Sequence, residues 1–200
     1  MNERPALRAV APFFGLAAVV FLVDQATKVM AHAWLRDGAP VSIVPGFFNL
    51  SYSRNPGGLF GYFGDLPDPW RGLLLTVLPL IAILLIGVFL LRSDGAHRLT
   101  RVGLGAILGG ALGNLVDRIV RGEVVDFLDV YASAPALADR LVRTFGTAHW
   151  PTFNIADSCI VVGAGLLILD TFRPQPREAP ARAPSHAAPE REGASRPGLE

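Results

Sequence analysis

The sequence predicts an all-α membrane protein with four transmembrane helices and a small extracytoplasmic β-element between the first and second helices. Of its 200 residues, 51% are hydrophobic and only 18% are charged, whereas a soluble domain usually carries about a quarter charged residues. Mean hydropathy is +0.40. The apolar residues are also gathered in four separate runs, which is the pattern expected of several bilayer-crossing helices.

The second run, residues 72–91, contains no formally charged residue. At about 1.5 Å per residue it forms a helix of about 30 Å, which crosses the hydrocarbon core. The other spans, at about 9–30, 102–120 and 153–172, contain charges that lie near the helix ends, where they reach the interface. Residues 31–33 have the A-x-A form of a signal-peptide cleavage site. Because Asp24 and Lys28 separate this motif from the apolar run, we expect the first span to be retained.

Four spans place both termini on one side of the membrane. Arginines flank the first span and crowd the loop between the second and third, and the positive-inside rule assigns this side to the cytoplasm: Arg4, Arg8, Arg92, Arg98 and Arg101. We therefore expect one membrane domain, residues 1–172. Residues 173–200 are rich in Pro, Ala, Arg and Glu, which predicts a disordered cytoplasmic tail whose truncation leaves the chemistry intact.

The outer loop 31–71 contains a strand pattern. Apolar and polar residues alternate over 48–53, which predicts a half-buried strand, and residues 41–44 are its candidate partner. Residues 55–58, N-P-G-G, are typical of a turn. We expect a small sheet at the membrane surface.

Small residues form two adjacent rows along the third span. Glycines recur at 105, 109 and 113, and the second row is 106, 110 and Asn114. Such rows let helices approach closely in lipid, so this side of the helix is expected to pack against protein. The rows lead into Asp117 and Arg118, for which we favour a structural ion pair and hydrogen-bond cluster over a direct chemical role.

Two carboxylates near the outer ends of the spans are candidates for chemistry. Asp126 lies between large apolar residues, where partial desolvation favours its protonated form, although it also fits a helix-end or loop carboxylate facing water. Asp157 occupies the third position of the fourth span, after Asn154 as N-cap, which is a capping-box pattern. The helix dipole favours its charged form. Asp129 is a weaker candidate.

The third span ends outside and the fourth begins outside, so Asp126 and Asp157 lie on the same side of the membrane. If they converge, they share one proton. The charged carboxylate then takes a proton from water and the neutral one donates to a scissile carbonyl. This is peptide hydrolysis without a metal ion, a cofactor or a covalent intermediate.

Other pairings are open at this point. Asp24 and Lys28 fit an intrahelical pair with the lysine reaching outward, or a role in orienting the outer loop or the substrate. Ser51 or Ser53 with Lys28 would make a serine–lysine hydrolase, which the strand pattern disfavours. Cys159 with His149 is a weaker nucleophile pair, because the only cysteine of the chain lies inside an apolar span and fits a packing role.

Four blocks of the sequence resemble those of the lipoprotein signal peptidases (signal peptidase II), an aspartyl protease family. Residues 24–28 are similar to its D-Q-x-T-K element and residues 54–61 to its R-N-x-G-A-x-F segment. Residues 109–118 with 124–127 resemble its G-N-x-x-D-R…V-x-D-F block, and 153–158 its F-N-x-A-D-S block. The blocks occur in the family's order and cover about residues 10–170.

The resemblance implies a membrane endopeptidase of bacteria, in the cytoplasmic (inner) membrane, with its active site at the outer face. It implies that Asp126 and Asp157 are the catalytic dyad. It also implies that substrate or dyad is supported by Asn55, Asn114, Arg118 and Asn154. We assign Asp24, Lys28 and Asp117 to the same supporting group and expect no metal or cofactor.

The implied substrates are prolipoproteins whose cysteine carries diacylglycerol, cut just before that cysteine. Membrane lipids are the other implied partners. A net charge of +1 indicates no nucleic-acid partner, and we expect a monomer.

The chain departs from the family at two places. Gly58 and Leu59 replace two small residues, and the stretch 131–150 is longer than usual. Within that stretch, residues 134–141 predict a short amphipathic helix, which we interpret as a lid over the site.

Rival classes are a small transporter or proton-relay protein and a non-catalytic assembly factor. A transporter predicts ionisable residues near the bilayer midplane, whereas Asp24, Asp117, Asp126 and Asp157 lie toward the outer ends of the spans. An assembly factor predicts that changing Asn114 to alanine affects stability alone.

Overall fold

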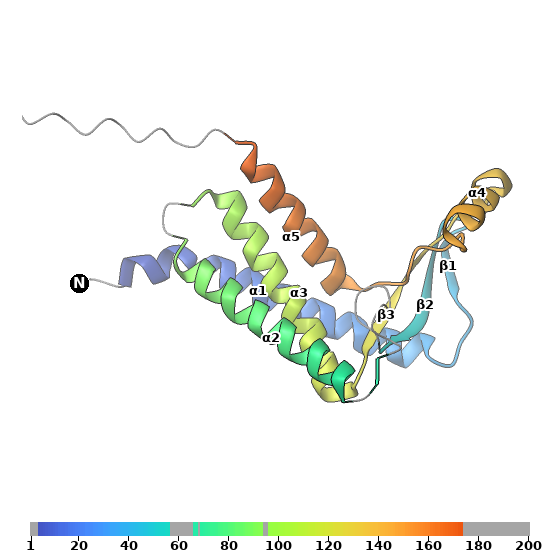
Figure 1. Cartoon of the computed structure of the whole chain (residues 1–200), viewed down its shortest axis with the longest axis horizontal. Helices are drawn as coiled ribbons and strands as arrows, with labels where there is room; N and C mark the ends of the chain where they lie inside the picture. Colours follow the sequence, from blue (N-terminus) through green and yellow to red (C-terminus); the bar gives the residue numbers. More distant parts are fainter. Residues whose placement is uncertain (1–3, 57–65, 68, 94–95, 174–200) are drawn as a thin grey trace, which may run out of the picture.

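The protein consists of a helical bundle that continues at one end into a small sheet (Figure 1). The computed structural model describes residues 4–56, 66–67, 69–93 and 96–173, and for residues 4–7 it describes the backbone alone. The helices are α1 (Arg4–Leu35), α2 (Trp70–Leu91), α3 (Arg98–Arg121), α4 (Pro135–Phe145) and α5 (Ile155–Thr171), and the strands are β1 (Val41–Val44), β2 (Phe48–Asn55) and β3 (Val124–Val130).

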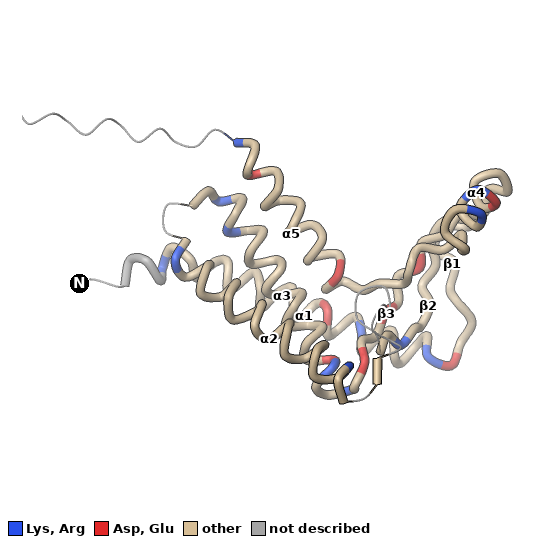
Figure 2. Tube along the Cα trace, in the orientation of Figure 1, with Lys and Arg blue, Asp and Glu red and all other residues tan. Residues whose placement is uncertain are grey.

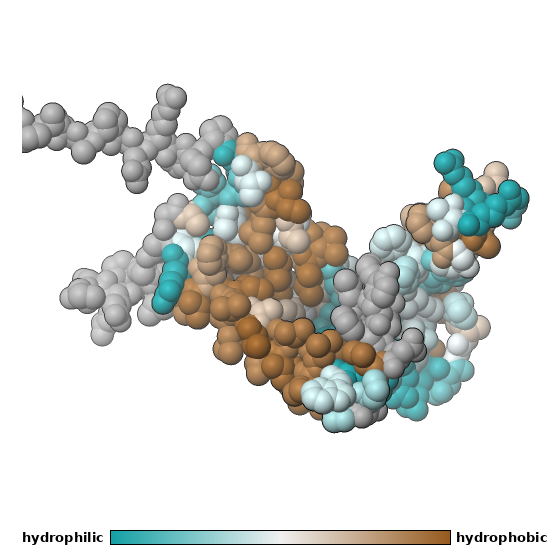
Figure 3. Space-filling view, in the orientation of Figure 1, coloured by the Kyte–Doolittle hydropathy of each residue, from teal (hydrophilic) through white to brown (hydrophobic). Residues whose placement is uncertain are grey.

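Three of the described helices are long and apolar enough to cross a membrane: Arg8–Leu35, Trp70–Leu91 and Arg98–Arg121. They correspond to the first three predicted spans. The fourth predicted span corresponds to α5, which has 17 residues and is shorter than the other three. Apolar surface covers the helical part of the molecule and hydrophilic surface gathers over the sheet (Figure 3).

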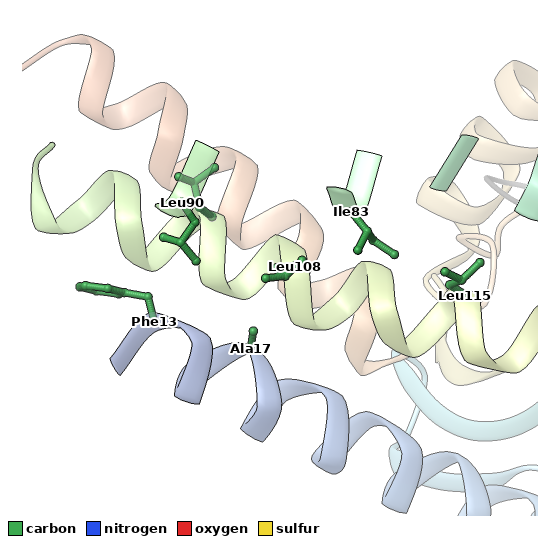
Figure 4. Close-up of a cluster of buried hydrophobic side chains, with 7 residues drawn as sticks. Phe13, Ala17, Ile83, Leu90, Leu108 and Leu115 are labelled. Atoms are coloured by element: carbon green, nitrogen blue, oxygen red, sulfur yellow. The ribbon is translucent and has the colours of Figure 1, made fainter. Parts of the chain in front are cut away.

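α3 lies at the centre of the bundle and packs against α5, α1 and α2. One apolar core joins α1, α2 and α3 through Phe13, Ala17, Ile83, Leu90, Leu104, Leu108 and Leu115 (Figure 4). The two predicted rows of small residues on α3 let two different helices approach closely, α1 on one side and α5 on the other. A Cβ atom added at Gly109 would lie 2.5 Å from the Ala17 carbonyl oxygen of α1, and one added at Gly110 would lie 2.5 Å from the Ala156 carbonyl oxygen of α5.

The sheet is antiparallel in the order β1-β2-β3. The predicted pairing of 41–44 with the strand at 48–53 is confirmed, and the strand extends to Asn55. The third strand was missed, because Asp126 was expected in a loop or at a helix end. β3 comes from beyond α3, so the sheet is not confined to the connection between the first two helices.

α1 continues into the sheet end of the molecule as part of the packed structure. Ala31 and Leu35 form a second buried cluster with Val125 and Phe127 of β3. The A-x-A motif at 31–33 therefore lies inside a continuous helix that supports the sheet, as expected for a retained segment.

The amphipathic helix expected within 131–150 is present as α4. It lies at the end of the sheet that points away from the bundle (Figure 1). In this structure it does not cover the predicted site as a lid. The predicted tail, residues 173–200, lies outside the described residues except for Arg173, and the departure at Gly58 and Leu59 lies outside them as well.

Candidate active site

Asp126 is held in β3, where its side chain is 1% exposed. Its two oxygens accept hydrogen bonds from different amides. Asn154 Nδ2 donates to Oδ1 at 2.7 Å, and Asn55 Nδ2 donates to Oδ2 at 3.0 Å. Burial and the nearby charge of Asp157 raise the pKa of Asp126 to about 7, against the hydrogen bonds from Asn55 and Asn154, which lower it. The protonated form is therefore well populated at neutral pH.

Asp157 lies in the first turn of α5, half-buried. The capping box expected from the sequence is present: Asp157 N–H donates to Asn154 Oδ1 at 2.9 Å, and Asn154 N–H donates to Asp157 Oδ2 at 3.2 Å. The other oxygen, Oδ1, accepts from Asn114 Nδ2 at 2.8 Å. Asn154 therefore contacts both carboxylates, and the convergence that the sequence left open is present.

The side-chain amides of Asn154 and Asn114 can each point only one way. In both, a group that only donates hydrogen bonds faces the amide oxygen, so the amide nitrogen faces a carboxylate. Asn154 Oδ1 receives the backbone N–H of Asp157, so its Nδ2 faces Asp126. Asn114 Oδ1 receives Lys28 Nζ at 2.9 Å, and a lysine ammonium is a donor only, so Asn114 Nδ2 faces Asp157. Each carboxylate is thus met by an amide donor whose direction is set by a second, neighbouring donor: the Asp157 backbone N–H for Asn154 and Lys28 for Asn114.

Lys28 is the centre of a buried ionic cluster that joins α1 to α3 and α5. Its Nζ lies 2.8 Å from Asp24 Oδ2 and 2.8 Å from Asp117 Oδ2, and all three side chains are 0% exposed. Ala156 N–H of α5 donates to Asp24 Oδ1 at 2.9 Å. The Asp24–Lys28 pair is confirmed, but the expectation that the lysine reaches outward is wrong, because Asn114 and Asp117 hold it inside the bundle.

Two further polar residues complete this cluster and were not selected from the sequence. Gln25 donates to Asp117 Oδ1 at 3.1 Å and to the Gly113 carbonyl at 3.1 Å. Arg121 forms an ion pair with Asp117 and donates to Gln25 Oε1 at 3.3 Å. The spacing i, i+4 from Asp117 to Arg121 is the signal that would have identified the arginine.

Asp117 and Arg118 have separate surroundings. Asp117 belongs to an ion-pair and hydrogen-bond cluster, as expected, and its ion-pair partners are Lys28 and Arg121. Arg118 lines a cavity, where Nη1 donates to the Asn114 carbonyl at 3.4 Å. Its Nε is buried and has no hydrogen-bond partner among the described residues. The structural cluster expected for Asp117 is thus present, whereas Arg118 forms no ion pair with the described residues of that cluster.

A cavity of about 680 Å³ lies over α3 between α2 and α5 and reaches Asp157 and Asn55, which are both linked to Asp126 by hydrogen bonds, directly or through Asn154. Its polar lining includes Asn55, Asn114, Arg118, Asp157 and Ser158, and its wall is otherwise mostly apolar: Leu74, Leu75, Leu78, Pro79, Ala82 and Ile86 from α2, and Ile160, Val161 and Val162 from α5. A smaller cavity of about 380 Å³ is lined by Val29, His32, Tyr52 and Arg54 among others, and neither dyad carboxylate lines it.

The alternative nucleophile pairs do not have suitable partners. All three donors of the Lys28 ammonium are engaged by Asp24, Asp117 and Asn114, so it is not a free base for a serine. His149 Nδ1 lies 2.8 Å from Asp129 Oδ1, and its ring stacks on Tyr131 rather than pairing with Cys159.

The family model described as Signal peptidase (SPase) II matches residues 16–173. The chain belongs to the signal peptidase II family. This family is one of aspartic-type peptidases, so the rival classes of transporter and assembly factor are set aside.

Relatives and solved structures agree with this membership. The lipoprotein signal peptidase of Syntrophus aciditrophicus is 42% identical over 165 residues, which cover 82% of this chain and 93% of that protein. That of Solibacter usitatus is 37% identical over 166 residues, covering 83% and 93%.

Two solved structures described as bacterial membrane enzymes, at 2.3 Å and 1.9 Å, are each 26% identical to this signal peptidase II family member, with TM-scores of 0.65 and 0.66. They cover 80% and 82% of this chain, and the chain covers 87% and 94% of theirs.

Proposed function

We propose that Asp126 and Asp157 are the catalytic dyad of a membrane endopeptidase that removes the signal peptide from diacylglyceryl-modified prolipoproteins, cutting just before the lipidated cysteine. The observation that carries the proposal is the pair of carboxylates linked by Asn154 at the end of a largely apolar cavity.

Asp126 is the neutral member of the pair and Asp157 the charged one. Asp126 is almost fully buried, whereas Asp157 is half-buried and lies at the positive end of the α5 dipole. The Asp157 carboxylate takes a proton from a water molecule, and the water oxygen bonds to the scissile carbonyl carbon. Asp126 gives its proton to the carbonyl oxygen.

The resulting tetrahedral intermediate breaks at its C–N bond. Asp157 gives the proton it gained to the leaving nitrogen, and Asp126 regains a proton from the intermediate as the carbonyl re-forms. One water is consumed, and an acid and an amine are released. The dyad returns to its starting protonation.

The supporting residues fall into two groups. Asn55, Asn114 and Asn154 hold the carboxylates in place, and Asp24, Lys28 and Asp117 fix the helices and the direction of the Asn114 amide. Arg118 has a different role, because its buried Nε has no partner among the described residues while its side chain lines the cavity. It is available to donate to the substrate.

The shape and lining of the cavity suit a lipid-modified substrate. Its wall between α2 and α5 is aliphatic, and neighbouring side chains of both helices are exposed on the outside of the bundle, for example Leu78 at 56% and Val161 at 71%. Acyl chains can therefore remain in the bilayer while the peptide lies at the dyad.

We further propose that α5 is a fourth membrane span. Its 17 residues make about 26 Å of helix, close to the about 30 Å hydrocarbon core. Arg8 lies near the start of α1, Arg98 and Arg101 lie in the first turn of α3, and Arg173 follows α5. These helix ends lie on the side of the bundle away from the sheet (Figure 1), and the sheet end carries both basic and acidic residues (Figure 2). The positive-inside rule then places both termini in the cytoplasm, and the dyad at the outer face of the bacterial inner membrane.

The membrane domain would comprise residues 1–172. We also propose that this domain acts as a monomer.

The test uses purified protein in lipid vesicles with a diacylglyceryl-modified prolipoprotein. Asp126→Asn and Asp157→Asn are expected to abolish cleavage while remaining folded. Asp129→Asn is the matched control, because Asp129 lies on the same strand but binds Asn49 and His149 rather than the dyad. Cleavage by either dyad variant would refute the assignment.

Asn114→Ala separates chemistry from stability. It removes the amide between Lys28 and Asp157, so turnover is expected to fall more than the thermal stability explains. A loss of stability alone would support a scaffold role for this cluster.

A further inference from the structure

Helix α4 divides cleanly into an apolar and a polar side. At about 100° per residue, the apolar residues Leu137, Ala138, Leu141, Val142 and Phe145 fall on one arc, and Asp139, Arg140, Arg143 and Thr144 fall on the opposite one. This is the pattern of a helix that lies at a boundary between an apolar and an aqueous phase.

None of the residues 135–145, all of which the structure describes, has a buried side chain. Leu137 is 50% exposed, Val142 48% and Phe145 73%. Hydrophobic and hydrophilic surface lie side by side on this helix (Figure 3). Leu137, Val142 and Phe145 of the apolar arc are therefore largely uncovered by the described part of the chain, whereas Ala138 and Leu141 are partly buried.

The base of α4 is nevertheless firmly attached to the sheet. Tyr131 N–H donates to the Phe47 carbonyl at 2.9 Å and Ser133 N–H to the Gly46 carbonyl at 3.1 Å. Ala132 N–H donates to the Ala148 carbonyl at 3.0 Å, which closes the segment behind the helix. An anchored helix with an uncovered apolar arc requires an external apolar phase.

The membrane of the chain itself lies within reach. Nine residues, 146–154, join α4 to α5, so the helix lies at most about 30 Å from the first turn of α5. Trp150 of this connection is 58% exposed and lines the cavity together with Val161 and Val162, which are 71% and 60% exposed on the outside of α5. Exposed apolar side chains therefore occur on α5, in the connection at Trp150 and on α4 at Phe145.

We propose that α4 is an interfacial helix that lies on the phospholipid surface at the sheet end of the bundle, with its apolar arc at the level where headgroups meet acyl chains. Arg140 and Arg143 extend from the opposite arc toward lipid phosphates at the surface. Tryptophan and phenylalanine at 150 and 145 suit the same depth. The helix holds the sheet, and with it β3, at a fixed height above the bilayer.

The experiment compares two spin labels on the full-length chain. Cys159 is the only cysteine, so Cys159→Ala provides the background, and Phe145→Cys and Arg143→Cys provide labelling sites two residues apart on opposite arcs. The proteins are placed in nanodiscs of phosphatidylethanolamine and phosphatidylglycerol. Collision of each label with oxygen, which concentrates in lipid, is compared with collision with a water-soluble nickel chelate.

We expect the label at 145 to collide severalfold more with oxygen and severalfold less with the nickel chelate than the label at 143. Equal access of both labels to the chelate would overturn the proposal, because α4 would then lie in water. Shielding of the label at 145 from both reagents would also overturn it, because protein would then cover the arc. Cleavage of prolipoprotein by the labelled variants checks the fold and reports on the proposed peptidase function separately.

Discussion

In the proposed mechanism Asn55 sets the pH range in which the dyad works, and its replacement is the sharpest test of the protonation assignment. Asn55 Nδ2 donates to Asp126 Oδ2 at 3.0 Å. This bond stabilises the charged carboxylate and lowers the pKa of Asp126 against the larger effect of burial. Asn55→Leu removes the donor with little change in side-chain size, so the pKa of Asp126 is expected to rise above its value of about 7.

The size of the effect follows from the bond that is lost. A hydrogen bond to a charged group contributes about 1.5–3 kcal/mol, and a change of one in pKa corresponds to about 1.4 kcal/mol. Asn55 is only half-buried, so the lower end of this range applies. Since Asp126 acts as the proton donor, kcat/KM falls as pH rises through its pKa. The variant should move this basic limb up by about one pH unit.

The assay is kcat/KM for prolipoprotein cleavage as a function of pH in lipid vesicles. Asn49→Leu is the matched control, because Asn49 lies on the same strand and donates to Asp129 Oδ2 at 3.4 Å. Its basic limb should stay where the wild-type limb is. A basic limb that stays in place in Asn55→Leu, or moves to lower pH, would refute Asp126 as the protonated member of the dyad.

Two further changes test the scaffold. Lys28→Met leaves Asp24 and Asp117 buried without their shared ammonium and should lower the free energy of unfolding by about 3–5 kcal/mol, measured by denaturant unfolding in mixed micelles. Adding Asp24→Asn should recover part of the loss, and no recovery would argue against an ionic origin. Gly109→Ala places a Cβ 2.5 Å from the Ala17 carbonyl oxygen and should cost about 1–3 kcal/mol through overpacking. Gly15→Ala, with nothing within 4 Å of the added carbon, should not, and an equal loss in both would contradict the close approach of α1 and α3.

The features that could be predicted from the sequence depend on local patterns. The uncharged run 72–91 corresponds to α2, because a bilayer-crossing helix requires an apolar stretch of that length. The alternation over 48–53 identifies β2, a half-buried strand that pairs on one side with the exposed strand β1. Asn154 and Asp157 form the capping box that their spacing predicts. In each case neighbours within a few residues carry the signal.

The features that were missed depend on contacts between distant residues. β3 is buried along Val124–Phe127 on both sides, so it shows no alternation, and its partner strand lies far away in the chain. An outward-reaching Lys28 stayed one of two alternatives, because nothing near it in the sequence predicts Asn114 and Asp117 as its partners. Arg118 was expected in the same structural cluster as Asp117, yet successive helix residues point about 100° apart and Arg118 lines the cavity instead.

Charge balance gives an independent reason for a neutral Asp126. Around the dyad, three carboxylates and three cations are joined by ion pairs or line the same cavity: Asp24, Asp117 and Asp157 with Lys28, Arg118 and Arg121. These charges cancel when Asp126 carries its proton. Ionising Asp126 would add an unbalanced charge to a carboxyl that is 1% exposed, which costs far more in a buried site than in water. In the proposed mechanism, the same cations that hold the helices together thus leave one carboxyl of the pair protonated and able to act as the acid.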